Sequence, residues 1–527
     1  MKRTLHLTVT LLLLLSVITY GQTPVALGDY NPGPEDAFSR FDFTTVELDG
    51  GFLLLADDGQ TGAELCILRD GSLSLVKDIN PGTESSDIGS FTEKDGWVYF
   101  TAFDTINGGA IWRTDGTEAG TELVFDPDTT NATRNVDEMI LAENGYLYFT
   151  YDLELYRTNG SEHERIGGPA RFSAPFNYRY DYFTTYEDGV AFLYAESFAD
   201  SISLFAATDT IRRLAATPEQ DGSYTWFGLQ NVRDGLIFSL VNSRPGRAQT
   251  GIYVYRPAAD TLVTVTADDN IFIASWLPMN DSLTIGMVSG DGYYAFTGDD
   301  NPTKIYDGST TALAAGQTIT NLSLGDQLIW QVNGGSFQDD LMGITDGTPE
   351  GTRIIEELED PFPSNIIATN RYVFFASGTS NGFQPILYYY DLETGETVEF
   401  YEAVERSLNL TSIIFVGVQG DLIYYISNLN PDTGRELYAI DPGLDLSTST
   451  PVVEETLDLL LTPDGATVRD DRDREVRVNF FDLSGRNLGN LTGRTNQLFP
   501  YPDYRGVLVA LFTVDGRTTA RKITVHR

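Results

Sequence analysis

One short pattern recurs along most of this 527-residue chain. A polar turn of Asp, Asn or Gly is followed by five or six residues rich in aromatic and β-branched side chains. Successive copies are spaced by roughly 44 to 50 residues, close to the length of a four-stranded propeller blade. The pattern therefore predicts a repeat of small β-sheets. The turns begin at Asp49, Asp95, Asn144, Asp188, Asp234, Asn280, Gly325, Asn370 and Gly420.

The second copy shows the expected order within one unit. Strands are predicted over 90–94, 97–103, 110–114 and 121–126, each separated from the next by Gly-containing turns. Short strands without a helical period favour antiparallel sheets. The nearly continuous apolar second strands indicate sheets covered on both faces, as in blades stacked around an axis.

The fold class predicted is all-β, a β-propeller of about eight or nine four-stranded blades. One closed ring over 22–445 is preferred because no Pro/Ser-rich linker interrupts the array. Two smaller propellers in tandem are the alternative.

The first 21 residues have the parts of a secretory signal peptide. Lys2 and Arg3 precede an apolar run over 5–18, and Gly21 stands before the expected cleavage at Gln22. The run is too short to span a bilayer comfortably, and no later segment of the sequence is long and apolar enough to do so. The sequence therefore predicts an exported protein with no transmembrane segment.

Charge is distributed unevenly around a formal net charge of −42. About −44 lies over 22–445 and about +4 over 467–527, which predicts a domain boundary. The acidic part should repel nucleic acid, so no nucleic-acid partner is expected. A solvated acidic surface explains the charge, and a calcium-loaded surface is the sharper alternative. The single cysteine, Cys66, lies in an apolar run and is expected to be buried and inert.

Two copies carry a more specific signature. One reads IWRTDGTEAGT over 111–121 and the other GITDGTPEGT over 343–352, while Asn159-Gly160-Ser161 is a decayed version. The signature resembles the ELWxTDGTxxGT repeat of exported, β-propeller-like bacterial proteins. The first match has Ile111 in place of Leu, but the other seven copies depart more widely. The resemblance therefore implies the type of blade rather than the number of blades.

Asp115 and Asp346 hold the Asp of this signature. Such an Asp can accept hydrogen bonds from the amides of its own turn, Gly supplies a positive φ, and Thr hydroxyls bind the next strand. A structural role is therefore expected. The alternative is a Ca²⁺ site at these two residues, which needs further oxygen ligands that the sequence does not place. Ca²⁺ is the only cofactor left open, and no other metal ligands are predicted.

The tail over 457–527 resembles the type A C-terminal sorting domain of type IX secretion substrates. The matching pieces are VRVNFFDLSGR over 476–486, YRGVLVA over 504–510 and RKITV over 521–525, while LTPD over 461–464 departs from the usual Pro-Asn-Pro-like start. The resemblance implies a small Ig-like β-sandwich, recognition by the type IX secretion machinery, and export to the outer cell surface or the medium. An ordinary Ig-like domain is the alternative. The Ser/Thr-rich segment over 446–456 is predicted to be a linker.

Histidine limits the available chemistry. His6 lies in the leader and His526 next to the last residue, so a His-based triad in the repeat domain would depend on His163 alone. Two carboxylates suffice for a glycosidase, and a lyase can use Tyr, Lys or Arg as its base. No pair stands out among 76 acidic residues, so no catalytic residue is predicted. The acidic doublets expected to be turn residues are Asp57-Asp58, Asp268-Asp269, Asp299-Asp300 and Asp339-Asp340.

The sequence favours a secreted or cell-surface propeller that acts as a non-catalytic binding or adhesion module for polysaccharide or another surface. A carbohydrate-active enzyme, either a glycoside hydrolase or a polysaccharide lyase, is the alternative, and a purely structural surface protein is a third hypothesis. The aromatic residues that would stack on sugars if exposed are Trp226, Trp276, Tyr178 and Tyr180. Two triplets resemble O-glycan acceptor sites of such secreted proteins, namely Asp104-Thr105-Ile106 and Asp260-Thr261-Leu262.

Overall fold

The structure of this chain is a computed structural model. The residues it describes form 43 strands and one 3₁₀ helix, η1 (Pro257–Ala259), so the protein is all-β, as the sequence predicts. No helix in this described part is long and apolar enough to cross a membrane. Two compact units, Met1–Thr450 and Pro451–Arg527, divide the chain. The described residues are 23–39, 44–126, 136–151, 154–168, 183–194, 202–217, 224–233, 235–242, 250–266, 273–280, 282–288, 292–298, 302–307, 319–324, 327–332, 341–355, 366–378, 385–402, 413–430, 432–444, 446, 458–462, 465–469, 474–482, 487–502, 506–514 and 517–525.

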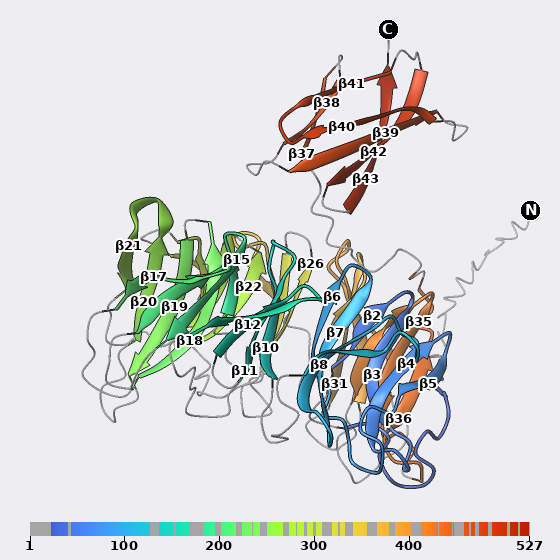
Figure 1. The fold of residues 1–527 in the computed structure, drawn as a ribbon. Coiled ribbons are helices and arrows are strands. Elements are labelled where there is room, and N and C mark those ends of the chain that lie inside the picture. Colours follow the sequence, from blue (N-terminus) through green and yellow to red (C-terminus); the bar gives the residue numbers. More distant parts are fainter. Residues whose placement is uncertain are drawn as a thin grey trace, which may run out of the picture. The chain divides into compact units, whose positions relative to one another are not determined.

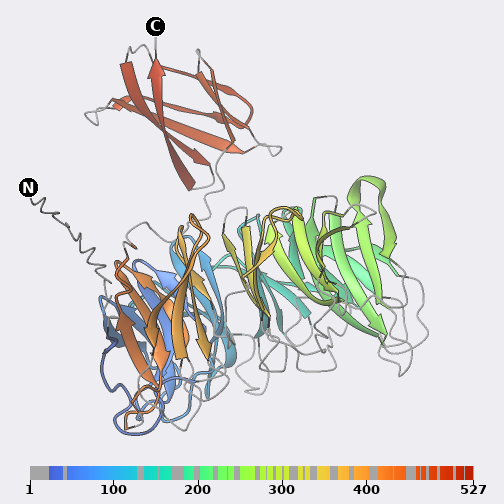
Figure 2. The same ribbon diagram turned by 180° about the vertical axis from the view of Figure 1, so that it is seen from behind.

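Nine four-stranded antiparallel sheets, called blades 1 to 9 here, make up the described part of the first unit (Figures 1 and 2). Blades 1 to 8 each use four consecutive strands, and blade 9 combines three consecutive strands with β1 from the N-terminal side.

The strands of blades 1 to 4 are β2 (Val46–Leu48), β3 (Gly51–Asp57), β4 (Ala63–Arg69), β5 (Ser72–Lys77); β6 (Gly89–Lys94), β7 (Trp97–Asp104), β8 (Gly108–Thr114), β9 (Glu122–Phe125); β10 (Val136–Leu141), β11 (Leu147–Tyr151), β12 (Glu154–Thr158), β13 (His163–Gly167); and β14 (Phe183–Tyr186), β15 (Gly189–Tyr194), β16 (Ser203–Ala207), β17 (Ile211–Ala216). Those of blades 5 to 9 are β18 (Tyr224–Val232), β19 (Gly235–Asn242), β20 (Thr250–Arg256), β21 (Thr261–Thr266); β22 (Ile273–Asn280), β23 (Leu283–Val288), β24 (Gly292–Phe296), β25 (Thr303–Asp307); β26 (Ile319–Leu324), β27 (Gln327–Val332), β28 (Leu341–Thr345), β29 (Arg353–Ile354); β30 (Ile367–Ala368), β31 (Tyr372–Gly378), β32 (Pro385–Asp391), β33 (Thr397–Glu402); and β34 (Ile414–Gln419), β35 (Leu422–Ser427), β36 (Glu436–Ile440), β1 (Val25–Ala26).

The strand order predicted for the second copy is confirmed. The four expected strands correspond to β6, β7, β8 and β9, and each observed boundary lies within two residues of the predicted one. All nine copies of the turn pattern found in the sequence precede the second strand of a blade. The pattern predicts these strands well because each is a mostly apolar run that begins directly after a polar turn.

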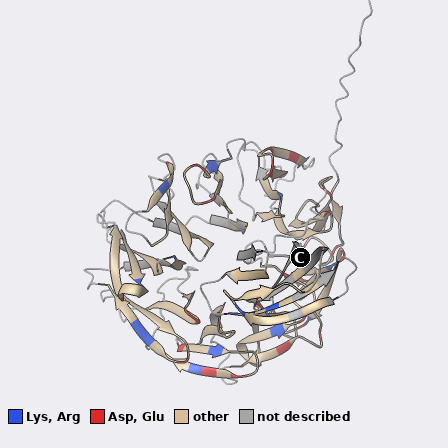
Figure 3. Ribbon diagram, turned by 90° about the horizontal axis from the view of Figure 1, so that it is seen from above, with Lys and Arg blue, Asp and Glu red and all other residues tan. Residues whose placement is uncertain are grey.

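Apolar clusters fill the junctions between successive blades, and one of them joins blade 9 to blade 1. This closing cluster contains Leu54 and Cys66 from blade 1 with Val416 and Ile426 from blade 9. In Figure 1 the blue strands of blade 1 accordingly lie beside the orange strands of blade 9, and Figure 3 looks onto the blades from above. The blades therefore form one closed ring of nine rather than two smaller propellers.

The N-terminal strap, defined as residues 25–38, completes the ring. Strand β1 supplies the outer strand of blade 9 through the pairs Val25↔Ala439 and Ala26↔Tyr438. Further along the strap, Asp36 Oδ2 lies 2.9 Å from Nη1 of Arg435, the residue before β36. Arg435 Nη1 also donates a hydrogen bond to the Phe38 carbonyl at 2.9 Å. Segments about 400 residues apart in sequence are thus joined by non-covalent contacts only.

A register shift recurs between the third and fourth strands of seven blades. Such a bulge twists the outer strand and makes it a poorer template for pairing with another chain, which protects the exposed edge of each blade. The shifts lie at Leu65/Cys66, Ile111/Trp112, Leu155/Tyr156, Leu204/Phe205, Ile252/Tyr253, Tyr293/Tyr294 and Leu387/Tyr388.

The second unit consists of two antiparallel sheets around its own core. Val476, Val478 and Phe480 of one sheet pack against Phe499 of the other, which makes the unit a small β-sandwich. The strands are β37 (Asp458–Thr462), β38 (Gly465–Arg469) and β41 (Leu498–Pro500) in one sheet, and β40 (Asn487–Arg494), β39 (Glu475–Asp482), β42 (Gly506–Val514) and β43 (Arg517–Val525) in the other.

Leu54→Ala tests the packing at the closing junction. Leu54 is fully buried between blades 1 and 9, so the variant should lose about 2–5 kcal/mol of unfolding free energy. Leu75→Ala is the matched control because Leu75 is 42% exposed on the outer strand β5. The control should change the unfolding free energy by no more than about 0.5 kcal/mol. Urea denaturation measures both variants, and equally small losses would contradict a packed junction between the first and last blades.

Candidate functional site

The two faces of the ring differ in the loops they carry. In an antiparallel blade, the turns between strands 1 and 2 and between strands 3 and 4 lie at one end of the sheet. The hairpins between strands 2 and 3, and the connections to the next blade, lie at the other end. The first end is called the short-turn face here because its strand 1 to 2 turns span only a few residues, such as 49–50 and 95–96. The second is called the long-loop face because it carries all the connections between blades.

The signature turn of blade 2 lies on the short-turn face and is held by its own side chains. Asp115 Oδ1 accepts hydrogen bonds from the Thr117 backbone N at 2.9 Å and from the Thr117 hydroxyl at 2.7 Å. Thr114 Oγ1 accepts the backbone N–H of Gly116 at 2.9 Å and lies 2.7 Å from the Thr121 hydroxyl. The pattern of Thr, Asp and Gly is therefore used to build the turn itself.

The turn of blade 7 repeats these contacts. Asp346 Oδ1 accepts hydrogen bonds from the Thr348 backbone N at 2.9 Å and the Thr348 hydroxyl at 2.7 Å. These bonds hold the pKa of Asp346 below its usual value. In both copies the carboxylate lies against a glycine, Gly120 or Gly351, where a Cβ would collide with it. The closing Gly of the signature is thus required by the Asp that the turn encloses.

The signature turn also forms a joint between blades. Gly116, at φ 84°, faces Ile67 and Arg69 of the preceding blade. The decayed turn of blade 3 does the same, because a Cβ at Gly160 would collide with Tyr99 and approach Arg113 of blade 2. The signature therefore serves to dock one blade onto the one before it.

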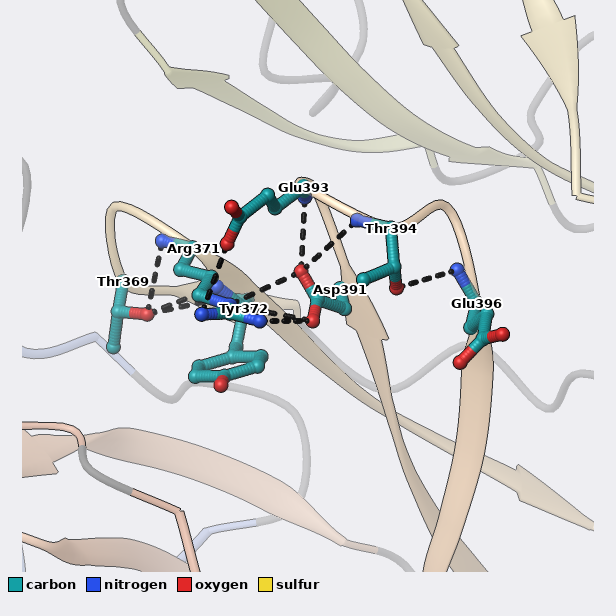
Figure 4. Close-up of polar contacts among 7 residues, drawn as sticks. All are labelled: Thr369, Arg371, Tyr372, Asp391, Glu393, Thr394 and Glu396. Atoms are coloured by element: carbon teal, nitrogen blue, oxygen red, sulfur yellow. Dashed lines mark hydrogen bonds and ion pairs between the residues drawn. The ribbon is translucent and has the colours of Figure 1, made fainter.

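A third polar cluster on the short-turn face lies in blade 8 (Figure 4). Arg371 donates from Nε and Nη2 to Asp391 Oδ2 at 3.2 and 2.8 Å, and its Nη1 lies 2.9 Å from Glu393 Oε2. The Arg371 guanidinium holds the pKa of Asp391 below its usual value. Asp391 Oδ1 also accepts the Glu393 backbone N–H at 2.9 Å, and Thr369 Oγ1 accepts that of Tyr372 at 3.0 Å. These groups tie two neighbouring turns together, which is a structural task.

On the long-loop face, the hairpin of blade 2 presents side chains outward on a hydrogen-bonded base. In the blade 2 hairpin, Asp104 is buried and its Oδ1 accepts the backbone N–H groups of Ile106 and Asn107, both at 2.7 Å. Asn80 Oδ1, from the connection after blade 1, accepts the Thr105 backbone N–H at 3.2 Å. Thr105 is exposed and Ile106 is 74% exposed. The triplet that resembles an O-glycan acceptor therefore stands at an accessible hairpin tip.

The described loops of this face around blades 9, 1 and 2 are strongly acidic. Their charged side chains favour neutral or cationic ligands over polyanions. The acidic residues are Asp29, Glu35, Asp36, Asp57, Asp58, Asp78, Glu84, Asp87, Asp104, Asp126 and Asp432, and the basic residues among them are Lys77 and Arg435.

The sequence pattern does not single out two carboxylates that are buried beneath loops of the long-loop face. Glu64 on β4 and Glu436 on β36 are 0% and 1% exposed, and each accepts backbone N–H bonds from a loop. Burial raises the pKa of both carboxyl groups to about 7. The repeated segment D-x-N-P-G, over 29–33 and 78–82, is the sequence signal that could have revealed them.

The remaining predicted residues fall in several places. Asp57 and Asp58 are turn residues, as expected, because their carboxylates accept the backbone N–H groups of Gly59 and Gln60 at 2.7 and 2.8 Å. Trp276 is 7% exposed and packs in the core between blades 5 and 6, so it cannot stack on a ligand. His163 is exposed at the start of β13 with its ring 5.1 Å from that of Phe125. The residues outside the described part are Tyr178, Tyr180, Asp268, Asp269, Asp299, Asp300, Asp339, Asp340 and, for its side chain, Trp226.

The Ca²⁺ site at Asp115 and Asp346 stays a prediction. The two residues lie in blades 2 and 7 rather than together. No group of three His, Cys, Asp or Glu side chains suited to a metal ion occurs among the residues that the structure describes.

The nine blades, closed by the cluster between blades 9 and 1, define the first unit as a β-propeller. Several solved structures resemble the chain distantly. A dipeptidyl peptidase 4 of Porphyromonas gingivalis is 8% identical, with a TM-score of 0.42 over 76% of this chain and 65% of that one. The WD40 domain of SCAP from fission yeast is 9% identical, with a TM-score of 0.40 over 68% of this chain and 93% of that one. A puromycin hydrolase is 13% identical, with a TM-score of 0.36 over 65% of this chain, and the chain spans 59% of its length. These TM-scores are all below 0.5, and nothing about this chain is concluded from them.

No protein-family model matches this sequence. A comparison with curated proteins likewise gives no match.

Asp346→Ala tests whether the carboxylate of Asp346 stabilises the signature turn. The variant removes the acceptor of two hydrogen bonds and should lose about 1 kcal/mol of unfolding free energy. Asp346→Asn keeps an oxygen at the same place and should lose less. Thermal unfolding of the two variants, with and without millimolar Ca²⁺, also tests the calcium prediction. A melting temperature that rises with Ca²⁺ in the wild type but not in Asp346→Asn would support a metal role. An unchanged melting temperature in the wild type would contradict it.

Proposed function

We propose that this chain is a secreted or cell-surface β-propeller that acts as a non-catalytic binding module through its long-loop face. The difference between the two faces carries the proposal. On the short-turn face, Asp115, Asp346 and Asp391 accept hydrogen bonds that hold their own turns and blades. On the long-loop face, the hairpin of blade 2 holds Ile106 outward on a hydrogen-bonded base. Rigid scaffolds commonly carry binding residues on such loops.

The ligand class follows from the charge and shape of this face. Acidic side chains such as Asp57, Asp87 and Asp432 surround the described loops, so an anionic polysaccharide would be repelled. An exposed apolar tip such as Ile106 suits the apolar face of a sugar ring or of a protein surface. A neutral polysaccharide is the ligand that fits both properties.

The proposed route of export depends on the two ends of the chain. Residues 1–21 have the composition of a signal peptide, and 457–527 resemble a type IX sorting domain. The separate core of the second unit, with Val478 and Phe480 against Phe499, supports an independently folded tail. The repeat domain would then be delivered to the outer cell surface or the medium, with the tail binding the secretion machinery.

Binding is tested with the mature chain and a panel of neutral and anionic polysaccharides, with and without Ca²⁺. Retention on a neutral polysaccharide without new chain ends is expected. Ile106→Ser should weaken retention about tenfold, because one apolar contact is lost. Leu422→Ser is the control, since Leu422 is 36% exposed but lies on the short-turn face. New chain ends would instead establish a glycoside hydrolase or a polysaccharide lyase, and equal effects of both variants would contradict binding at the long-loop face.

Export is tested by deleting 457–527 and locating the protein by cell fractionation in a host with type IX secretion. The full chain should reach the cell surface or the medium, whereas the shortened chain should stay in the periplasm. Unchanged export of the shortened chain would contradict the sorting role of the tail. Retention of the full chain in the cytoplasm would contradict the signal peptide.

A further inference from the structure

The segment D-x-N-P-G occurs twice on the long-loop face, each time after the outer strand of a blade. The copy over 78–82 follows β5 and leads from blade 1 into blade 2. The copy over 29–33 follows β1, the outer strand of blade 9, and leads into blade 1. One copy is an ordinary connection between blades, and the other belongs to the N-terminal strap that closes the ring.

A buried glutamate holds each copy. Glu64 Oε2 accepts the backbone N–H of Ile79 at 2.8 Å, and its Oε1 accepts that of Asn80 at 3.4 Å. In the strap, Glu436 Oε2 accepts the backbone N–H of Tyr30 at 3.1 Å, and its Oε1 accepts that of Asn31 at 3.4 Å. Both glutamates occupy the start of the third strand of their blade, directly before a leucine.

Further along, the backbone hydrogen bonds of the strap match those of the connection between blades 1 and 2. Ser86 N donates to Ala63 O at 3.2 Å in the internal connection, and Ala37 N donates to Arg435 O at 3.1 Å in the strap. Each of these loops then accepts a backbone bond from the next blade, since Phe103 N donates to Ser86 O at 2.7 Å and Asp57 N donates to Ala37 O at 2.8 Å. The strap is therefore a connection between blades that no covalent bond joins to blade 9.

We propose that the N-terminal strap is a detachable connection, that Glu436 is the clasp that holds it, and that the ring opens at the junction of blades 9 and 1 by release of this clasp. At every other junction the chain itself runs from one blade to the next, so release of a loop leaves the blades tethered. Only at this junction does loss of the loop also remove a strand from a blade.

Protonation of Glu436 couples this opening to pH. The groups that face Glu436 are Asp29 and Asp36 from the strap and Tyr438 from its own strand, while Arg435 is paired with Asp36. Burial, and then these acidic neighbours, raise the pKa of Glu436 to about 7. The closed ring thus holds the proton more tightly than the open form, whose glutamate has an ordinary pKa. Proton binding by Glu436 therefore stabilises the closed ring. This stabilisation is fully present below about pH 4.5 and is lost as the pH rises through about 7.

Hydrogen exchange followed by mass spectrometry on the full chain tests the clasp. After correction for intrinsic exchange, the opening equilibrium of peptides covering 25–38 should rise about tenfold from pH 6 to pH 8. Peptides covering β19, the second strand of blade 5, should remain protected and serve as the reference for global unfolding. Exchange of the strap at the same rate as β19 at every pH would overturn the proposal, because the ring would then open only by unfolding.

Two glutamine variants test whether the pH response of the strap comes from Glu436. Glu436→Gln should remove the pH response of the strap, since no proton is bound or released at the clasp. Glu64→Gln is the matched control, because the same group is changed in a connection tethered at both ends, and the strap should keep its response. A full pH response in Glu436→Gln would contradict the role of this residue. Hydrogen exchange of the wild-type chain from pH 6 to pH 8 tests whether the ring opens at this junction, even if Glu436→Gln does not fold.

Discussion

The pairing of a two-residue strand with the last blade is the interaction on which the whole ring depends. Each blade is apolar on both faces, so it is stable only between two neighbours, and blades 1 and 9 find each other only if the ring closes. Strand β1 brings only Val25 and Ala26 into register with β36. The rest of the strap adds Asp36 on Arg435 and the amides held by Glu436. A short strand suffices because these contacts repeat those of an internal connection.

The sequence predicted what local chemistry determines. Turns such as Asp95-Gly96 before continuous apolar runs located the second strands, and the count of these runs agrees with nine blades. The role of Asp115 in its own turn also followed from residue types at fixed spacing. Long-range partners could not be found in this way. Glu436 lies about 400 residues from the amides it binds, and a strand of two residues has no period to detect.

The roles of aromatic residues also could not be predicted from the sequence. In strands buried on both faces, periodicity does not separate a core side chain from a ligand-facing one. Trp276 was therefore an equal candidate for both roles, and the structure places it in the core with its Nε1 donating to Ser239 at 3.1 Å. The sequence marks Ile106 only as part of an O-glycan-like triplet, yet its side chain is 74% exposed on the long-loop face. Its exposure depends on the buried Asp104 beneath it.

A cross-link between β1 and β36 tests whether the N-terminal strap closes the ring. Val25→Cys and Ala439→Cys, combined with Cys66→Ser, place two thiols at directly paired positions. Under mild oxidation the folded protein should form an intramolecular disulfide that mass spectrometry assigns to these two residues. The control pair, Val25→Cys with Leu422→Cys, should stay reduced. A folded protein in which the closing pair does not cross-link, or cross-links only between chains, would contradict the closed ring.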